Sequence, residues 1–169
     1  MTTLQRSLVK MKSRITVFIV LYSLSPQVYA KAYFQSKNEM IEKAKAIAII
    51  DIFAIQDSDT KGKTWTYRTK GTAKVEETLK GVLPEELTIY GAETFICASC
   101  PVAQGRFIAF LKKDGDLWTG SNWHLSLRPI KDDMVEWYVA DDNRYEMKPT
   151  DLKTVITEIK SHKSEPGGM

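Results

Sequence analysis

The feature that most constrains the fold is a run of ten residues, Ala46–Ile55, in which only Asp51 is polar. Five of the ten residues are isoleucine. Side chains branched at Cβ are stiff and fit the pleated surface of a sheet better than a helix. A short, continuous apolar run of this kind is typical of a strand with both faces buried. The run therefore predicts a buried central strand around which the rest of a domain packs.

Shorter patterns on either side of this run predict further strands and two helices. Ser36 and Glu39 have the spacing of a capping box and predict a short helix over about 36–45. Near the other end, Thr150 is expected to cap a helix with an apolar stripe. Between them we expect strands, separated by turns, at 64–79 with a bulge or bend at Gly71, and at 87–90, 105–112, 117–119, 123–130 and 135–139.

These elements predict a mainly β fold. Five or six short strands, with one helix at each end, favour a small closed barrel, because closure leaves no exposed strand edge. A chain of 169 residues is long enough for one domain and short for two. We expect the domain to cover residues 31–163, followed by a disordered tail over 164–169.

The first thirty residues have the layout of a secretory signal peptide. Basic residues precede an apolar stretch of ten residues, Ile15–Leu24, and Ala30 ends a plausible cleavage site. A helical membrane span needs about 20 apolar residues, so the stretch is short for an anchor. We therefore predict export to the periplasm or the extracellular medium, with cleavage before Lys31. Translation from Met11 would leave a sufficient signal.

Removing this segment changes the charge of the chain. Four of the 24 basic residues and none of the 21 acidic residues lie in 1–30, so the remainder carries 20 against 21. Nucleic-acid binding needs basic side chains gathered on one face. A nearly neutral domain without such a cluster is not expected to bind nucleic acid, nor to keep a membrane anchor once the signal is removed.

The middle of the chain resembles a family of exported bacterial proteins. Val75–Gly81, a turn with a proline, Leu87–Tyr90, a cysteine and Gly105–Leu111 follow one another in the family's order, after Met40–Ala44 and the isoleucine run. These proteins are similar to the OB-fold domain of tissue inhibitors of metalloproteinases and to netrin modules. The resemblance covers about residues 36–120 and implies a five-stranded OB-type barrel. The inhibitors bind zinc through an N-terminal Cys, whereas this mature chain is expected to begin at Lys31.

Cys97 and Cys100 are the only cysteines, spaced as in C-x-x-C thiol redox motifs. An exported protein would favour a disulfide between them. Reactive pairs usually open a helix, whereas Pro101 and a strand follow here. We expect a structural disulfide, with a redox-active pair or a metal ligand as the alternatives.

His124 is the candidate centre of a hydrolytic site. A catalytic reading would pair it with Ser121 or Ser126 and with Asp116. The sequence has no nucleophile motif to support this, so a structural or exposed histidine is the simpler interpretation. Paired acids such as Glu76 and Glu77 are expected to be solvated, since neighbours on a strand point to opposite faces. We predict no metal site and no cofactor.

Aromatic residues are the remaining candidates for a binding site. OB barrels bind oligosaccharides or oligonucleotides on one face and its loops, and aromatic rings stack on sugars or anchor protein partners. The candidates are Trp65, Tyr67, Trp118, Trp123 and His124. The alternative is that most aromatic residues, Trp137 and Tyr138 among them, pack the core.

Taken together, the sequence predicts an exported, non-catalytic binding or interaction module for a protein or carbohydrate partner. A thiol-disulfide oxidoreductase that uses Cys97 and Cys100 is the first alternative. A small hydrolase centred on His124 is the second.

Overall fold

The computed structural model describes residues 33–95, 99–141 and 146–162. The predicted signal peptide over 1–30 and the predicted tail over 164–169 lie outside these residues. Within them, no helix is long and apolar enough to cross a membrane.

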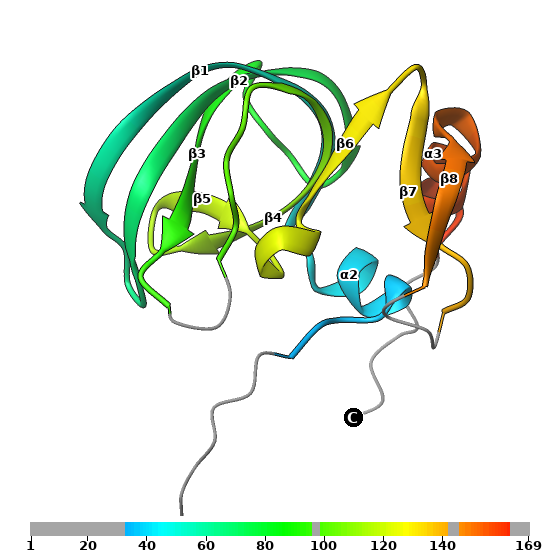
Figure 1. Ribbon diagram of the computed structural model, residues 1–169, viewed down its shortest axis with the longest axis horizontal. Coiled ribbons are helices and arrows are strands. Elements are labelled where there is room, and N and C mark those ends of the chain that lie inside the picture. Colours follow the sequence, from blue (N-terminus) through cyan, green and yellow to red (C-terminus); the bar gives the residue numbers. More distant parts are fainter. Residues whose placement is uncertain (1–32, 96–98, 142–145, 163–169) are drawn as a thin grey trace, which may run out of the picture. The chain divides into compact units, whose positions relative to one another are not determined.

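The described residues form a mainly β structure with eight strands and two α-helices (Figure 1). The helices are α2 (Lys37–Lys43) and α3 (Leu152–Ser161), and a single 3-10 turn, η1, covers Trp123–Leu125. The strands are β1 (Ala46–Lys61), β2 (Thr66–Lys80), β3 (Glu86–Glu93), β4 (Gly105–Asp114), β5 (Leu117–Gly120), β6 (Leu127–Lys131), β7 (Met134–Tyr138) and β8 (Met147–Asp151).

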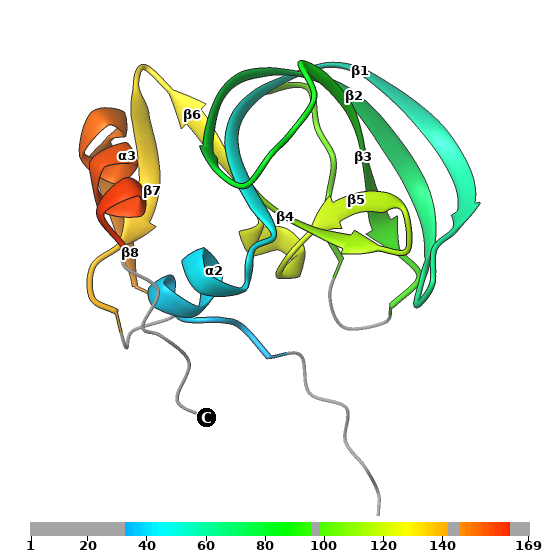
Figure 2. The same cartoon turned by 180° about the vertical axis from the view of Figure 1, so that it is seen from behind.

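Five of the strands pair into a closed ring. The order is β1-β2-β3-β5-β4, and β4 returns to pair with β1. All of these pairings are antiparallel except the one between β3 and β5. Figures 1 and 2 show the long, curved β1 and β2 on one side of the ring. The ring leaves β1 without an open edge along its N-terminal half, where β2 and β4 both bond to it.

The isoleucine run lies in β1, and the prediction that it is buried on both faces is correct only for its first part, Ala46–Ile52. Phe53 and Ile55, at its end, are 51% and 38% exposed. Ile50 and Ile52 point into the ring, where they pack with Ile89, Ala109 and residues of the other ring strands. Ile47 and Ile49 point the other way, into a second core that α2, β7 and α3 cover. The alternation of a strand thus divides one apolar run between two cores.

The second core is completed by strands that continue beyond the ring. β6 pairs with β4, β7 with β6, and β8 with β7. Trp137 of β7 is 2% exposed and stacks on Phe110 at 6.0 Å between ring centroids. Its indole nitrogen donates to a carboxylate oxygen of Glu158 in α3 at 2.7 Å. The core-packing interpretation is therefore correct for Trp137, and also for the buried Tyr138.

Most predicted elements are present, and the C-terminal part differs in detail. The capping box of Ser36 and Glu39 begins α2 as predicted. The expected strand at 123–130 is divided into η1 and β6. The prediction that Thr150 caps the last helix is wrong: Asp151 is the N-cap and accepts from the Thr154 amide at 3.2 Å. Thr150 lies in β8, a strand that the sequence analysis missed because Pro149 weakens the strand pattern.

A buried carboxylate ties the β1–β2 connection to the ring. Asp114, at the end of β4, accepts from the Tyr67 hydroxyl at 2.8 Å and from the backbone amides of Thr64 and Trp65 at 2.8 and 3.1 Å. Burial alone would raise the pKa of Asp114, but these hydrogen bonds outweigh it and hold the pKa below its ordinary value. The charged Asp114 side chain therefore holds the loop that carries Trp65 against the end of β4.

Replacing Tyr67 by Phe is expected to destabilise the protein by about 1.5–3 kcal/mol, because a buried carboxylate loses a hydrogen bond. Urea unfolding measures the change. Tyr90→Phe is the matched control, since the Tyr90 hydroxyl has no hydrogen-bond partner among the described residues, and it should alter stability by less than about 0.5 kcal/mol. Equal losses in the two variants would contradict the role given to Asp114.

Candidate functional site

Five aromatic side chains from four separate segments meet in one continuous series of ring contacts, which we call the aromatic surface. Trp65 lies 5.2 Å from Phe95 between ring centroids, and Phe95 stacks on Trp123 at 6.0 Å with an interplanar angle of 9°. Phe34 then joins the series, at 6.1 Å from Trp123 and 5.0 Å from His124. Segments as far apart as residues 34 and 124 thus build a single surface.

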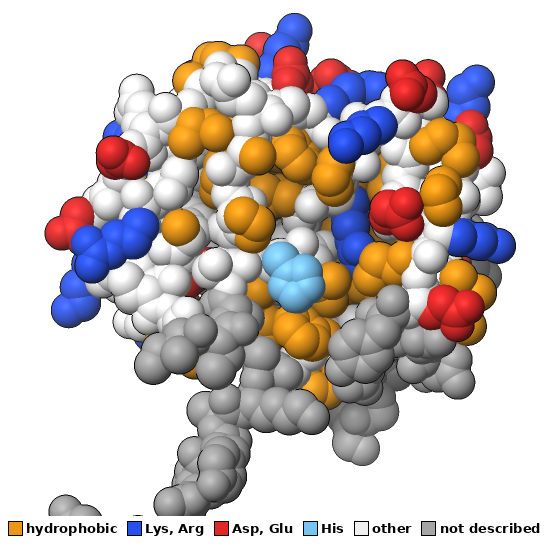
Figure 3. All heavy atoms as spheres, viewed as in Figure 1, with side chains coloured by type: hydrophobic (Ala, Val, Ile, Leu, Met, Phe, Trp, Pro, Cys, Tyr) orange, Lys and Arg blue, Asp and Glu red, His pale blue; other side chains and the backbone are white. Residues whose placement is uncertain are grey.

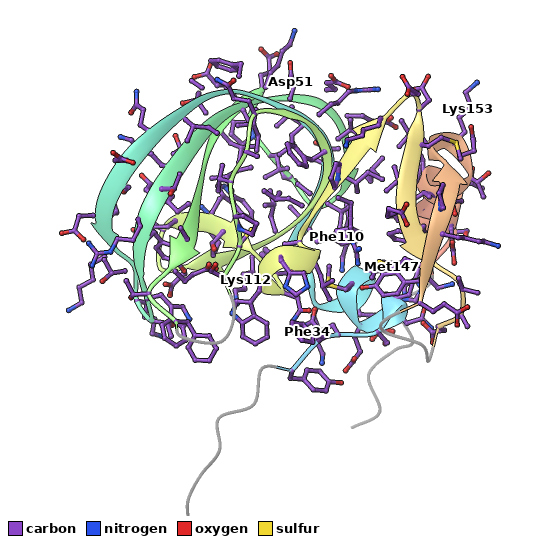
Figure 4. The ribbon with its side chains drawn as sticks, viewed as in Figure 1. Phe34, Asp51, Phe110, Lys112, Met147 and Lys153 are labelled. Carbon is purple, nitrogen blue, oxygen red and sulfur yellow. The ribbon has the colours of Figure 1, made fainter. Side chains whose placement is uncertain are left out.

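Asn122 fixes the N-terminal segment against η1. Its side-chain oxygen accepts from the Gln35 amide at 3.1 Å, and its side-chain nitrogen donates to the Tyr33 carbonyl at 2.9 Å. The amide group of Asn122 therefore pairs with the backbone on both sides of Phe34, much as a neighbouring strand would. This pairing places the Phe34 ring beside Trp123 and His124, and Figure 4 shows Phe34 below the position of η1.

The turn that carries Trp123 and His124 is tightly specified. Trp123 has φ +46°, a left-handed conformation that is rare for a bulky residue. The Ser126 hydroxyl accepts from the backbone amide of Asn122 at 2.7 Å, and the backbone amide of Ser126 donates to the Trp123 carbonyl at 3.0 Å. Strained backbone persists only where its surroundings hold it, and such positions concentrate at functional sites.

The other two rings are held by connections at the same end of the ring of strands. The Asp114 carboxylate fixes the backbone of Trp65, as described above. The residue before Phe95, Thr94, donates its amide to the Thr66 carbonyl at 3.0 Å, so the end of β3 stays beside the start of β2. Trp65 and Phe95 are thereby positioned by hydrogen bonds of their own backbone or of an adjacent residue.

The aromatic surface is open to solvent. His124 is exposed, and Phe34, Trp65, Phe95 and Trp123 are each partly exposed. Figure 3 shows a histidine bordered by hydrophobic side chains, over the place that η1 takes in Figure 1. Although the residue is exposed, its ring is partly desolvated, which lowers the pKa of His124 below 6.5, and the nearby positive charge of Arg128 lowers it further. The histidine is therefore mostly neutral near pH 7 and adds an uncharged ring to the surface.

The predicted binding residues fall into two groups. Trp65, Trp123 and His124 lie in the aromatic surface. Tyr67 is fully buried inside the ring, and Trp118 packs partly buried against the ring core, with the Lys113 ammonium 4.1 Å above its ring. We do not include Tyr67 or Trp118 in the site.

Sequence reasoning missed Phe34 and Phe95. Both residues lie outside the predicted strands and helices, in segments without any periodic pattern. The only signal was their aromatic character, which they share with many core residues. Their positions depend on hydrogen bonds from neighbouring backbone amides to Asn122 and to the Thr66 carbonyl. No local sequence pattern predicts these bonds.

Cys100 lies in the hydrophobic core inside the ring. Its thiol is free in the structure and 0% exposed, and its amide donates to the buried carboxylate of Glu93 at 2.6 Å. Its carbonyl accepts from the Ala92 amide at 2.8 Å. Burial, followed by the charge of Glu93, raises the pKa of the Cys100 thiol far above its ordinary value. Cys97 lies outside the described residues, so the disulfide stays a prediction.

The expected catalytic partners of His124 are not hydrogen-bonded to it. The His124 ring packs edge-on against the Phe34 ring, and the Ser126 hydroxyl accepts from the backbone amide of Asn122. Among the described residues, no three His, Cys, Asp or Glu side chains gather at a spacing that would hold a metal ion. Paired acids such as Glu76 and Glu77 form ion pairs at the surface with Arg106 and Lys160.

Comparison with known proteins gives no match to a family model, to a curated protein or to a solved structure.

The buried thiol of Cys100 is expected to resist alkylation in the folded protein. Iodoacetamide reacts with thiolates, and a buried thiol with a raised pKa forms almost none near pH 8. After chemical reduction, peptide mass mapping should find Cys100 unmodified in the folded protein and fully modified in 6 M guanidinium chloride, about the strength at which most domains unfold. Rapid labelling of Cys100 under native conditions would contradict its burial.

Proposed function

We propose that this chain is an exported, non-catalytic binding module whose aromatic surface holds the ligand. The observation that carries the proposal is the unbroken series of five rings, partly open to solvent and held in place by buried or backbone hydrogen bonds. Rigid aromatic side chains that face solvent supply much contact area for little loss of side-chain entropy. Export is supported by the signal-peptide pattern over 1–30.

The strand order supports a finer assignment of the ring. We infer that β1-β2-β3-β5-β4 is a small OB-type barrel, because five strands close on themselves with β1 shared between β2 and β4. In such barrels the β1–β2 connection belongs to the usual ligand face. Trp65 lies in that connection here. The similarity to metalloproteinase inhibitors is proposed for the fold alone.

The surroundings of the candidate catalytic residues favour binding over chemistry. A nucleophile needs a base within hydrogen-bond reach, and the ring of His124 packs on Phe34 while the Ser126 hydroxyl holds a backbone amide. Thiol exchange needs an accessible thiolate, whereas the Cys100 thiol is buried with a raised pKa. The contacts of His124, Ser126 and Cys100 therefore support a structural role for these residues rather than a catalytic one.

The expected ligand presents a flat apolar face. Aromatic rings stack on the apolar faces of sugars and pack against aromatic or aliphatic side chains of a protein. A carbohydrate and a protein segment therefore offer the same complementary chemistry, and the experiment has one arm for each.

Site-specific photo-crosslinking tests the protein arm. Benzoylphenylalanine in place of His124 should give a discrete crosslinked product in cells that export the chain, and Trp65→Ala or Trp123→Ala should abolish it. The same photoreactive residue at Phe53, which is 51% exposed, is the matched control and should give none. Figure 4 shows that Asp51, two residues before Phe53, lies at the opposite end from Phe34.

Oligosaccharide titration tests the carbohydrate arm. Cellohexaose or chitohexaose should shift the indole NMR signals of Trp65 and Trp123 and leave the buried Trp137 unchanged. The proposal fails if neither sugar shifts these signals and if positions 53 and 124 give the same crosslinks. It also fails if a substrate is turned over in a way that His124→Ala abolishes.

A further inference from the structure

Arg128, in β6, is a buried cation whose charge has no acidic partner among the described residues. The residue is 6% exposed, and it takes part in no ion pair there. Taking a guanidinium out of water costs several kcal/mol unless an opposite charge accompanies it. Burial lowers the pKa of Arg128, and the charge and hydrogen bond of Tyr138, together with the more distant charge of Glu136, offset this only in part. Among the described residues, no carboxylate forms an ion pair with this arginine.

The polar atoms of the guanidinium are satisfied on one side only. Nη1 lies 2.7 Å from the sulfur of Met147, and the guanidinium carbon sits 5.0 Å from the centroid of the Tyr138 ring. Within the described part of the chain, Nε and Nη2 are buried without a hydrogen-bond partner. These two nitrogens form one edge of the planar group, and their N–H bonds on that edge point the same way.

A carboxylate fits this free edge. Its two oxygens accept the two parallel N–H bonds of an arginine edge, and its charge balances the buried cation. Water could satisfy the hydrogen bonds but would leave the charge uncompensated. The neighbours of Arg128 are the faces of Tyr138 and the side chain of Met147, so the group that carries the carboxylate should be apolar or aromatic.

One neighbour of the guanidinium, Met147 at Nη1, is a flexible side chain. Met147 is partly exposed and begins β8, close to α2 in Figure 4. A methionine side chain is unbranched and flexible, so it can move aside at little cost.

Buried polar atoms in native proteins are nearly always satisfied, so the two unpaired donors of Arg128, Nε and Nη2, indicate a missing acceptor.

We propose that Arg128 is the anchor of a carboxylate-binding site between β6 and β8, which takes a small carboxylate on an apolar or aromatic body. This site rests on Arg128 and is independent of the ligand of the aromatic surface.

The experiment uses benzoate as the probe and benzamide, its neutral counterpart of the same shape, as the control ligand. At constant ionic strength, benzoate should raise the melting temperature of the protein in a concentration-dependent way, as a ligand of the folded state does. Benzamide should leave it unchanged. In ¹⁵N NMR, benzoate should also shift the Nε–H signal of Arg128 alone among the arginines.

Two variants locate the effect. Arg128→Lys keeps the charge but loses the two parallel donors, so benzoate affinity should fall about ten-fold or more. Arg68→Lys, at an exposed arginine paired with Asp59, is the matched control and should bind benzoate as the wild type does.

The comparison of benzoate with benzamide on the wild-type protein needs no variant to fold. Equal effects of the two ligands, or no effect of benzoate, would overturn the proposal and leave Arg128 a cation solvated by buried water. Unchanged benzoate binding in Arg128→Lys would also overturn it. Neither result would bear on crosslinking from position 124.

Discussion

The pairing of β1 with two neighbours at once is the constraint on which the rest of the structure depends. Ala46–Ile52 of β1 pair with β4, while β2 bonds along the other edge. A strand so rich in isoleucine would otherwise present an apolar, aggregation-prone edge. Closure removes that edge and buries alternate isoleucines in two different cores. The ring and the layer of α2, β7 and α3 are thus two consequences of one sequence run.

Closure also determines where the aromatic residues are placed. The β1–β2 connection, the end of β3 and the η1 turn come together at one end of the ring, and the N-terminal segment is drawn to the same place by Asn122. The ring interior is already filled, by Tyr67, Cys100 and the isoleucines. The interior therefore has no space for the large aromatic side chains at this end, and they remain partly exposed. This arrangement requires a strained, left-handed backbone conformation at Trp123, which the Ser126 hydroxyl and the other hydrogen bonds of the turn stabilise.

The strands that carry strong periodic patterns could be predicted from the sequence. The isoleucine run and the capping box of Ser36 act through their immediate neighbours, so local residues reveal them. β8 could not be predicted, because Pro149 makes it an edge strand that exists only through pairing with β7. The site was half predictable for the same reason: Trp65, Trp123 and His124 are conspicuous, whereas Phe34 owes its place to hydrogen bonds across 87 and 89 residues. Arg128 shows nothing unusual in the sequence, since its lack of an ion partner is a property of the packed structure.

The ring gathers separate segments into an aromatic surface that faces solvent. The most direct measurement is ¹⁹F NMR of protein labelled with 5-fluorotryptophan, which gives one signal for each of the four tryptophans. A soluble paramagnetic agent broadens the signals of residues that solvent reaches. We expect strong broadening for Trp65 and Trp123 and almost none for Trp137, which is 2% exposed. Protection of Trp65 and Trp123 equal to that of Trp137 would contradict this expectation.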